Sequence, residues 1–234
     1  GSTVTRRDGV VSPDGRLVAH QDQEQRLWVH DVRTGSGRVI ATSDVAAFRD
    51  LRWSADSQWL AYVQVGANAF SRIWLHAVTD GTTRPITTDR FDSYSPTWSP
   101  DGVWLYFLSD RTFESVVPSP WGVRQPEPFF DRQTRVYQIA LRKDARSRFA
   151  TKDERATPLR DPLAKRGASV APAARMTIDL DGLAARVSDV PLVPGNYGAL
   201  DTDGQRLYFL SWEAGGTGRK ALRMLPIDDS RQLE

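Results

Sequence analysis

The stretch Ser99-Pro100-Asp101-Gly102-Val103-Trp104-Leu105-Tyr106-Phe107 joins a tight turn to a short apolar strand. Proline presets φ for the first central position of a turn, aspartate bonds to its own backbone, and glycine takes a positive φ without a steric penalty. A turn and a strand of the same kind begin at Ser12, at Ser54 and at Asp201. The chain therefore contains four copies of one supersecondary unit, and such a repeat points to a repetitive architecture.

The spacing of the repeat indicates which architecture this is. Asp14, Asp56 and Asp101 hold the same place in the first three turns, at separations of 42 and 45 residues. Periods of this length, with several strands in each unit, are typical of the blades of a β-propeller. Asp203 of the fourth turn follows 102 residues after Asp101, which predicts inserted segments between the third and fourth turns.

The strand after each turn has one consistently apolar face. Side chains alternate between the two faces of a strand, so residues two apart share a face. Leu105 and Phe107 therefore point the same way in the third unit, and His20 takes the place of the aromatic residue in the first unit, where we expect it to face the core. We predict that eight side chains are buried between blades: Trp53, Leu60, Tyr62, Trp98, Leu105, Phe107, Leu207 and Phe209.

Further strands complete each unit. Arg26-Leu27-Trp28-Val29-His30 aligns with Arg72-Ile73-Trp74-Leu75-His76, and no stretch has a convincing helical period. The predicted fold class is all-β: a β-propeller segment of about four four-stranded antiparallel blades, with long inserts in the third and fourth units. We expect one partial propeller domain over residues 1–234, with approximate blades at 1–42, 43–88, 89–154 and 155–234.

The inserts and the chain start are less regular. Residues 111–131 are rich in proline, and residues 142–176 are polar and rich in proline and alanine, which favours a loop or a linker for the second segment. We expect Met176 to open the fourth unit. Thr3-Val4-Thr5 is the expected inner strand of the first unit.

The composition excludes several classes of site. The chain has no cysteine, so it has no disulfide, no thiolate metal site and no cysteine nucleophile, and it suits a reducing compartment. Its 31 basic and 29 acidic residues give a net charge of +2, and acidic residues and prolines interrupt the basic segment at 142–166. No nucleic-acid partner is therefore expected. No apolar run approaches the ~20 residues of a membrane span, so no membrane partner is expected either.

Few residues could carry catalysis. A serine-type site needs a nucleophile and a base held together, and His20, His30 and His76 are the available bases. His30 and His76 recur at one position of the repeat, which is typical of a structural residue. We therefore predict no catalytic residue in this chain.

Two acidic pairs resemble the start of a calcium loop. Asp179 with Asp181, and Asp201 with Asp203, each precede a glycine, but neither pair is followed by the remaining oxygen ligands. Turn formation is the simpler interpretation. We predict no metal-binding residue, no cofactor-binding residue and no cofactor.

Aromatic residues of the first insert form the one candidate binding surface. Trp121, Phe129 and Phe130 could contact a peptide. Packing across a blade face is the alternative explanation for these side chains.

Several stretches resemble a known family. The repeated turn and strand are similar to the TolB and tricorn type of propeller repeat. Residues 94–113 and 128–141 resemble the second propeller of bacterial tricorn-like peptidases, as do Ile178-Asp179-Leu180-Asp181-Gly182-Leu183 and Pro194-Gly195-Asn196-Tyr197. Arg148 departs from the family pattern, which usually has proline at that position.

The resemblance implies a function for the parent protein. Members of this family are cytoplasmic serine peptidases, in which two propellers precede a helical segment, a PDZ-like domain and the catalytic domains. The family's catalytic Ser, His and Glu lie downstream and map onto no position here. We therefore expect a non-catalytic segment that acts in peptide access or assembly in the cytoplasm. Its expected partners are peptides or proteins and the other domains of the parent.

Two other functions stay open. The chain could be an independent TolB-like protein-interaction module, or the propeller of a prolyl-oligopeptidase-type peptidase; the downstream sequence distinguishes them. Open terminal blades also predict self-association, because an unpaired strand edge is a template for pairing. A closed four-bladed ring is the alternative.

Overall fold

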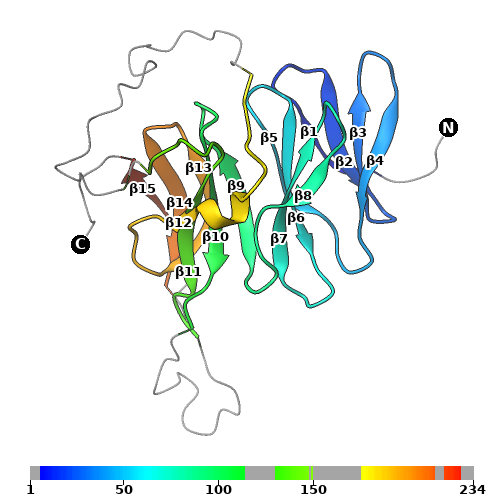
Figure 1. Ribbon diagram of the computed structural model, residues 1–234. Helices are drawn as coiled ribbons and strands as arrows, with labels where there is room; N and C mark the ends of the chain where they lie inside the picture. The colour runs from blue at the N-terminus through cyan, green and yellow to red at the C-terminus, as the bar shows by residue number, and fades with distance from the viewer. Residues whose placement is uncertain (1–5, 114–129, 148, 150–174, 214–218, 228–234) are drawn as a thin grey trace, which may run out of the picture.

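The strands form four antiparallel sheets that follow one another along the chain and stand side by side (Figure 1). The computed structural model of the protein describes residues 6–113, 130–147, 149, 175–213 and 219–227. The first sheet has the order β1 (Arg6–Val11), β2 (Leu17–Asp22), β3 (Arg26–Asp31) and β4 (Gly37–Thr42). The second sheet has the order β5 (Arg49–Trp53), β6 (Trp59–Val65), β7 (Ser71–Ala77) and β8 (Thr83–Pro85).

The other two sheets follow the same plan. The third has the order β9 (Ser93–Trp98), β10 (Trp104–Asp110), β11 (Thr134–Ala140) and β12 (Val187–Asp189). The fourth has the order β13 (Asn196–Thr202), β14 (Arg206–Trp212) and β15 (Ala221–Pro226). A short 3₁₀ helix, η1 (Leu183–Arg186), precedes β12. The predicted all-β propeller segment is confirmed.

The repeated turn is held by its own side chains. Ser12 Oγ donates to Asp14 Oδ1 at 2.6 Å and accepts from the Leu17 backbone N at 2.9 Å. Gly15 has φ 71°, a value that glycine adopts without a steric penalty. The second and third turns repeat this arrangement with Ser54 and Ser99. The local turn chemistry thus sets the start of the second strand in each of these sheets.

Two strands differ from the sequence expectation. The inner strand of the first sheet is β1, directly before Ser12; the expected strand at residues 3–5 lies outside the described residues. In the fourth sheet, three strands rather than four are present within the described residues.

The boundary between the third and fourth blades also requires a correction. Met176 was expected to open the fourth unit, but the segment that it begins leads into β12, which pairs antiparallel with β11. Tyr137 pairs with Asp189 and Ile139 with Val187. The third sheet therefore recruits its outer strand from beyond the second insert, because the edge of β11 offers unpaired backbone groups that β12 can satisfy.

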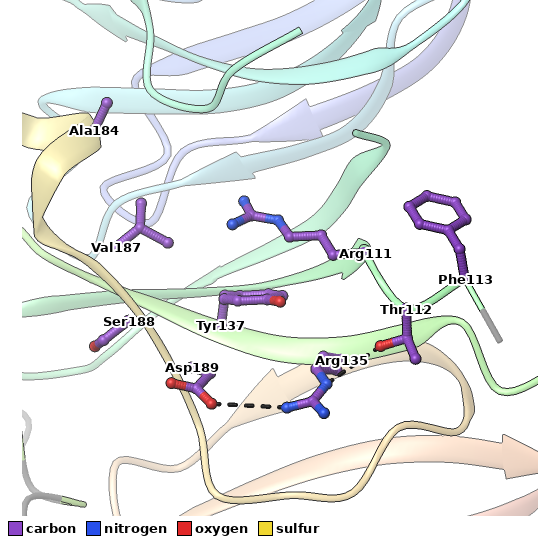
Figure 2. Close-up of a pocket in the computed structure, with 9 residues that line it drawn as sticks. All are labelled: Arg111, Thr112, Phe113, Arg135, Tyr137, Ala184, Val187, Ser188 and Asp189. Atoms are coloured by element: carbon purple, nitrogen blue, oxygen red, sulfur yellow. Dashed lines mark hydrogen bonds and ion pairs between the residues drawn. The ribbon is translucent and has the colours of Figure 1, made fainter. Parts of the chain in front are cut away.

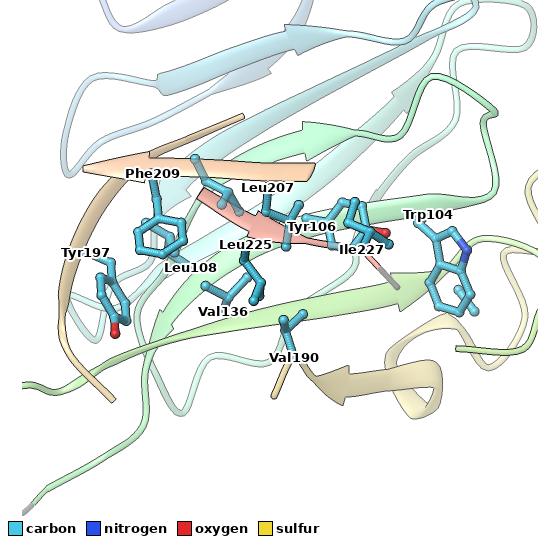
Figure 3. Close-up of a cluster of buried hydrophobic side chains, with 12 residues drawn as sticks. Trp104, Tyr106, Leu108, Val136, Val190, Tyr197, Leu207, Phe209, Leu225 and Ile227 are labelled. Atoms are coloured by element: carbon cyan, nitrogen blue, oxygen red, sulfur yellow. The ribbon is translucent and has the colours of Figure 1, made fainter. Parts of the chain in front are cut away.

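Three buried clusters fill the three interfaces between successive sheets. Leu60 and Tyr62 face the first sheet, while Ala61 and Val63 of the same strand face the third. This division follows from the alternation of side chains along a strand. Figure 3 shows the third interface, where Phe209 and Tyr197 of the fourth sheet meet the third sheet. All eight predicted core residues are at most 8% exposed, so the predicted core is confirmed.

The ends of the row of sheets are not packed on each other. The clusters join the first sheet to the second, the second to the third and the third to the fourth, and within the described residues none joins the fourth to the first. Leu222 and Met224 of β15 are 71% and 55% exposed. The described residues thus form an open arc of blades. No helix in the described part of the chain has the length and apolar character needed to cross a membrane.

Candidate functional site

The candidate site lies on the third sheet, at the end of β10. The backbone N atoms of Arg111 and Thr112 both donate to the Gln133 carbonyl at 3.2 Å, so the chain stays beside β11 after the strand ends. This path places Arg111 next to Tyr137, which stacks on Phe107 across the β10–β11 pair with ring centroids 5.6 Å apart. The register of the two strands therefore creates an aromatic surface under the arginine.

The Arg111 guanidinium is surrounded by aromatic rings. Its central carbon lies 4.1 Å from the Tyr137 ring centroid, 5.4 Å from that of Phe91 and 5.9 Å from that of Phe107. A cation over an aromatic face is attracted by the ring quadrupole, and the attraction grows as water is removed. Arg111 Nε also donates to Ser109 Oγ at 3.0 Å. The rings thus hold the guanidinium in one place.

The charge of Arg111 is not offset by any carboxylate in the described part of the chain. No carboxylate of the described residues lies within ion-pair distance of its guanidinium. Burial lowers the pKa of Arg111 below its usual value, and Tyr137 acts in the opposite direction. An arginine nevertheless remains protonated at neutral pH. The site therefore contains a half-buried positive charge that, among the described residues, is surrounded by aromatic rings and a hydroxyl group.

An open hollow of about 720 Å³ lies beside this arginine. Figure 2 shows Arg111 and Tyr137 on one side, and Val187, Ser188 and Asp189 of β12 on another. Ala184 of η1 also lines the hollow. The late return of β12 to the third sheet therefore builds one wall of the site.

A second arginine, Arg135 of β11, also lines the hollow. Arg135 Nη1 is 3.8 Å from Asp189 Oδ2, and its Nε donates to Thr112 Oγ1 at 3.3 Å. The negative charge of Asp189 therefore offsets the positive charge of Arg135. Arg111, Arg135 and Asp189 together leave the hollow with one net positive charge.

An exposed aromatic residue, Phe113, lies at the edge of the hollow. The residue is 54% exposed, and its ring stacks on that of Phe91 with centroids 6.2 Å apart and meets that of Phe130 edge-on at 6.1 Å. Of the predicted peptide-contact residues, Phe130 therefore lies next to the hollow, although it does not line it, and Trp121 and Phe129 lie outside the described residues. Peptide contact by these three residues stays a prediction.

Sequence reasoning missed Arg111 as a site residue. The residue follows an aromatic-rich strand and precedes Phe113, which is the signal that could have drawn attention to it. Its neighbours Phe91 and Tyr137 are 20 or more residues away in the sequence, so their convergence could not be read from spacing. The tertiary fold brings them together.

His76 lies in the interface between the first and second sheets, away from this hollow. Arg38 Nη2 of β4 is 3.2 Å from His76 Nε2, and His76 Nδ1 is 2.7 Å from Thr83 Oγ1. A guanidinium can only donate, so Nε2 must accept and Nδ1 must carry the proton. Burial and the Arg38 charge lower the pKa of His76 to about 4. His76 therefore has no lone pair with which to activate the Thr83 hydroxyl.

His20 and His30 lie on the opposite face of the first sheet from Ala19. Their rings stack with centroids 4.9 Å apart, and Trp28 stacks on His30 at 5.6 Å. His20 is 6% exposed and so is buried as expected, but it belongs to none of the three interface clusters. These contacts make the histidines part of a packed aromatic surface.

One aspartate of each calcium-like pair accepts hydrogen bonds from the backbone. Asp203 Oδ1 accepts from the backbone N of Gln205 at 2.8 Å and of Arg206 at 2.6 Å. Asp179 Oδ2 accepts from the Lys143 backbone N at 2.8 Å. Across the described ranges, no three His, Cys, Asp or Glu side chains are grouped so that they could hold a metal ion.

Comparison with known proteins gives a consistent family. The sequence profile described as "Tricorn protease second beta propeller domain" matches residues 2–224. "Tricorn protease homolog 1" of Streptomyces coelicolor is 29% identical over 194 residues, which cover 81% of this chain and 17% of that protein. The "Tricorn protease homolog" of Saccharolobus solfataricus is 34% identical over 101 residues, or 43% of this chain and 9% of that one. The chain thus spans less than a fifth of the length of these two curated relatives.

Solved structures show the same fold. The crystal structure of the tricorn protease superposes with a TM-score of 0.72 at 19% identity, covering 95% of this chain and 21% of that one. The putative TolB from Agrobacterium tumefaciens has a TM-score of 0.59 at 14% identity, covering 98% of this chain and 65% of that one. At these identities the likeness is one of fold.

Proposed function

The chain belongs to the family of the tricorn protease second β-propeller domain, and on this basis we propose that it is a non-catalytic propeller segment of a tricorn-like serine peptidase. Its role in the parent is to admit peptides to a catalytic part elsewhere, or to assemble with that part. The observation that carries this proposal is the family match, which extends over residues 2–224. The parent would work in the cytoplasm, as the family resemblance implies.

The arrangement of the histidines supports a non-catalytic role. Nucleophilic catalysis needs a base with a free lone pair directed at the nucleophile. His76 has its Nε2 occupied by Arg38 and its proton on Nδ1. This geometry favours a structural role for His76.

The open hollow at Arg111 supports a peptide-binding role. It combines a positive charge with exposed aromatic surface, and arginine and aromatic side chains are enriched among the residues that contribute most to protein binding. The other proposed partners are the remaining domains of the parent, which would cover the open faces of the terminal blades.

The proposal predicts binding without cleavage. The purified chain should bind members of a panel of fluorogenic peptides and release no fluorophore. Turnover that persists after repurification, and that survives substitution of His20, His30 and His76, would contradict a non-catalytic segment. The gene sequence downstream of Glu234 gives a second test: a PDZ-like domain followed by a catalytic domain with Ser and His supports the proposal.

A second candidate is an independent TolB-like interaction module. The TolB structure from Agrobacterium tumefaciens matches 98% of this chain, which is the observation in its favour. A stop codon shortly after Glu234 would support this candidate. An α/β-hydrolase domain would instead support a prolyl-oligopeptidase-type parent, since a prolyl endopeptidase structure matches with a TM-score of 0.51.

A further inference from the structure

The starting point is the unbalanced charge of Arg111. Buried or half-buried charges in proteins are normally paired, because removal from water is costly for a lone ion. Arg26, which is also partly buried, follows this rule, because it contacts the buried Asp22 at 2.7 Å. Arg111 is instead held by three aromatic rings and the Ser109 hydroxyl. Among the described residues no carboxylate pairs with it, and a ligand could supply one.

The hollow is positioned to receive that anion. Arg111 and Arg135 both line it, and Asp189 balances one of the two charges. An arginine fork can bind a carboxylate through two parallel hydrogen bonds, which are stronger than bonds between neutral groups. Because the rings fix the guanidinium before a ligand arrives, little conformational entropy would be lost on binding.

The edge of the hollow adds an apolar contact. Phe113 is 54% exposed and stacks on Phe91, whose ring also faces Arg111. A peptide that places a carboxylate on Arg111 could therefore lay a neighbouring apolar side chain on Phe113. Inorganic anions could not use this second contact.

We propose that the hollow beside Arg111 binds a carboxylate of a peptide, with the guanidinium as its counter-charge and Phe113 as the contact for an adjoining apolar side chain. This inference rests on the proposed function, since it names the chemical group that the propeller recognises in its peptides. The carboxylate belongs either to the peptide C-terminus or to an acidic side chain.

Three fluorescein-labelled peptides test the proposal by anisotropy. The first is Gly-Ala-Ala-Leu-Phe with a free C-terminal carboxylate, the second is the same peptide as its C-terminal amide, and the third is the amide with Glu at the third position. We expect the free acid or the glutamate peptide, or both, to bind the wild-type chain about tenfold more tightly than the neutral amide. The peptide that binds more tightly than the neutral amide shows whether the recognised carboxylate is the C-terminal one or that of the glutamate side chain.

Variants connect this preference to Arg111. R111Q should bind all three peptides as weakly as wild type binds the neutral amide. R111K keeps the charge but loses the fork, so it should retain only part of the preference. R72Q is the matched control, because the Arg72 guanidinium also lies over a ring, that of Trp74 at 5.4 Å, but outside the hollow. R72Q should bind like wild type.

Several outcomes would overturn the proposal. Equal binding of acid and amide by wild type would refute carboxylate recognition and leave peptide access standing, whereas no binding of any peptide would count against both. An unchanged preference in R111Q would exclude Arg111; if R111Q does not fold, an unchanged preference in R111K has the same meaning.

Discussion

The interface between the first and second blades should be sensitive to acid because of His76. In the folded chain its Nε2 accepts a hydrogen bond from Arg38. A proton on Nε2 would therefore break this bond and place a second positive charge beside the guanidinium. Burial is the larger cause, and together with the Arg38 charge it lowers the pKa of His76 to about 4. An unperturbed histidine, as in the unfolded chain, has a pKa of about 6.5.

The sign and the size of the effect follow from these two values. Below pH 6.5 His76 binds a proton in the unfolded chain but not in the folded chain. The contribution of neutral His76 to the free energy of unfolding is therefore fully present above pH 6.5 and is lost as the pH falls. The loss grows until the folded pKa is reached near pH 4. A difference of two to three units corresponds to about 3 kcal/mol in total, and to about 2 kcal/mol at pH 5.

Urea unfolding followed by tryptophan fluorescence measures this loss. We compare wild type with H76Q at pH 7.5 and pH 5, because glutamine can accept from Arg38 and donate to Thr83 but does not titrate. Wild type should lose about 2 kcal/mol more than H76Q between the two pH values. Carboxylates titrate equally in both proteins, so their contribution cancels in the comparison.

Two further variants locate the cause. R38Q should weaken the pH dependence, because removing the guanidinium raises the pKa of His76 towards its usual value. H30Q, at the same position of the preceding blade, should leave the contribution of His76 intact. Equal losses in wild type and H76Q would refute the reasoning.

Two other predictions concern the core and the ends of the arc. Leu105 is fully buried between the second and third sheets, so Leu105→Ala should lower the free energy of unfolding by about 2–5 kcal/mol. Val39→Ala, at a site 40% exposed, is the control and should change the free energy of unfolding little. Similar urea unfolding midpoints for the two variants would contradict the blade register. Leu222 and Met224 expose an apolar sheet face, so the wild-type chain should self-associate and Leu222→Lys with Met224→Lys should reduce this. Light scattering at several concentrations measures the association, and a strictly monomeric wild type would exclude it.

Much of the fold could be predicted because its determinants are local. The Ser12, Ser54 and Ser99 turns are closed by hydrogen bonds within six residues, and the same residue types recur at each copy. Alternation along the following strand then assigns Leu105 and Phe107 to one face. The repeat, the propeller architecture and the predicted core residues therefore follow from the sequence alone.

The site depended on contacts that no local pattern encodes. β12 joins the third sheet from beyond a long insert, because strand pairing is decided by backbone hydrogen bonds between distant segments. Arg111 meets Phe91 and Tyr137 because the strand register and the blade packing place them together. The sequence by itself determined the propeller architecture and the family. The tertiary structure alone decided that Arg111, an aromatic surface and an open hollow lie together, because long-range packing sets the distances between them.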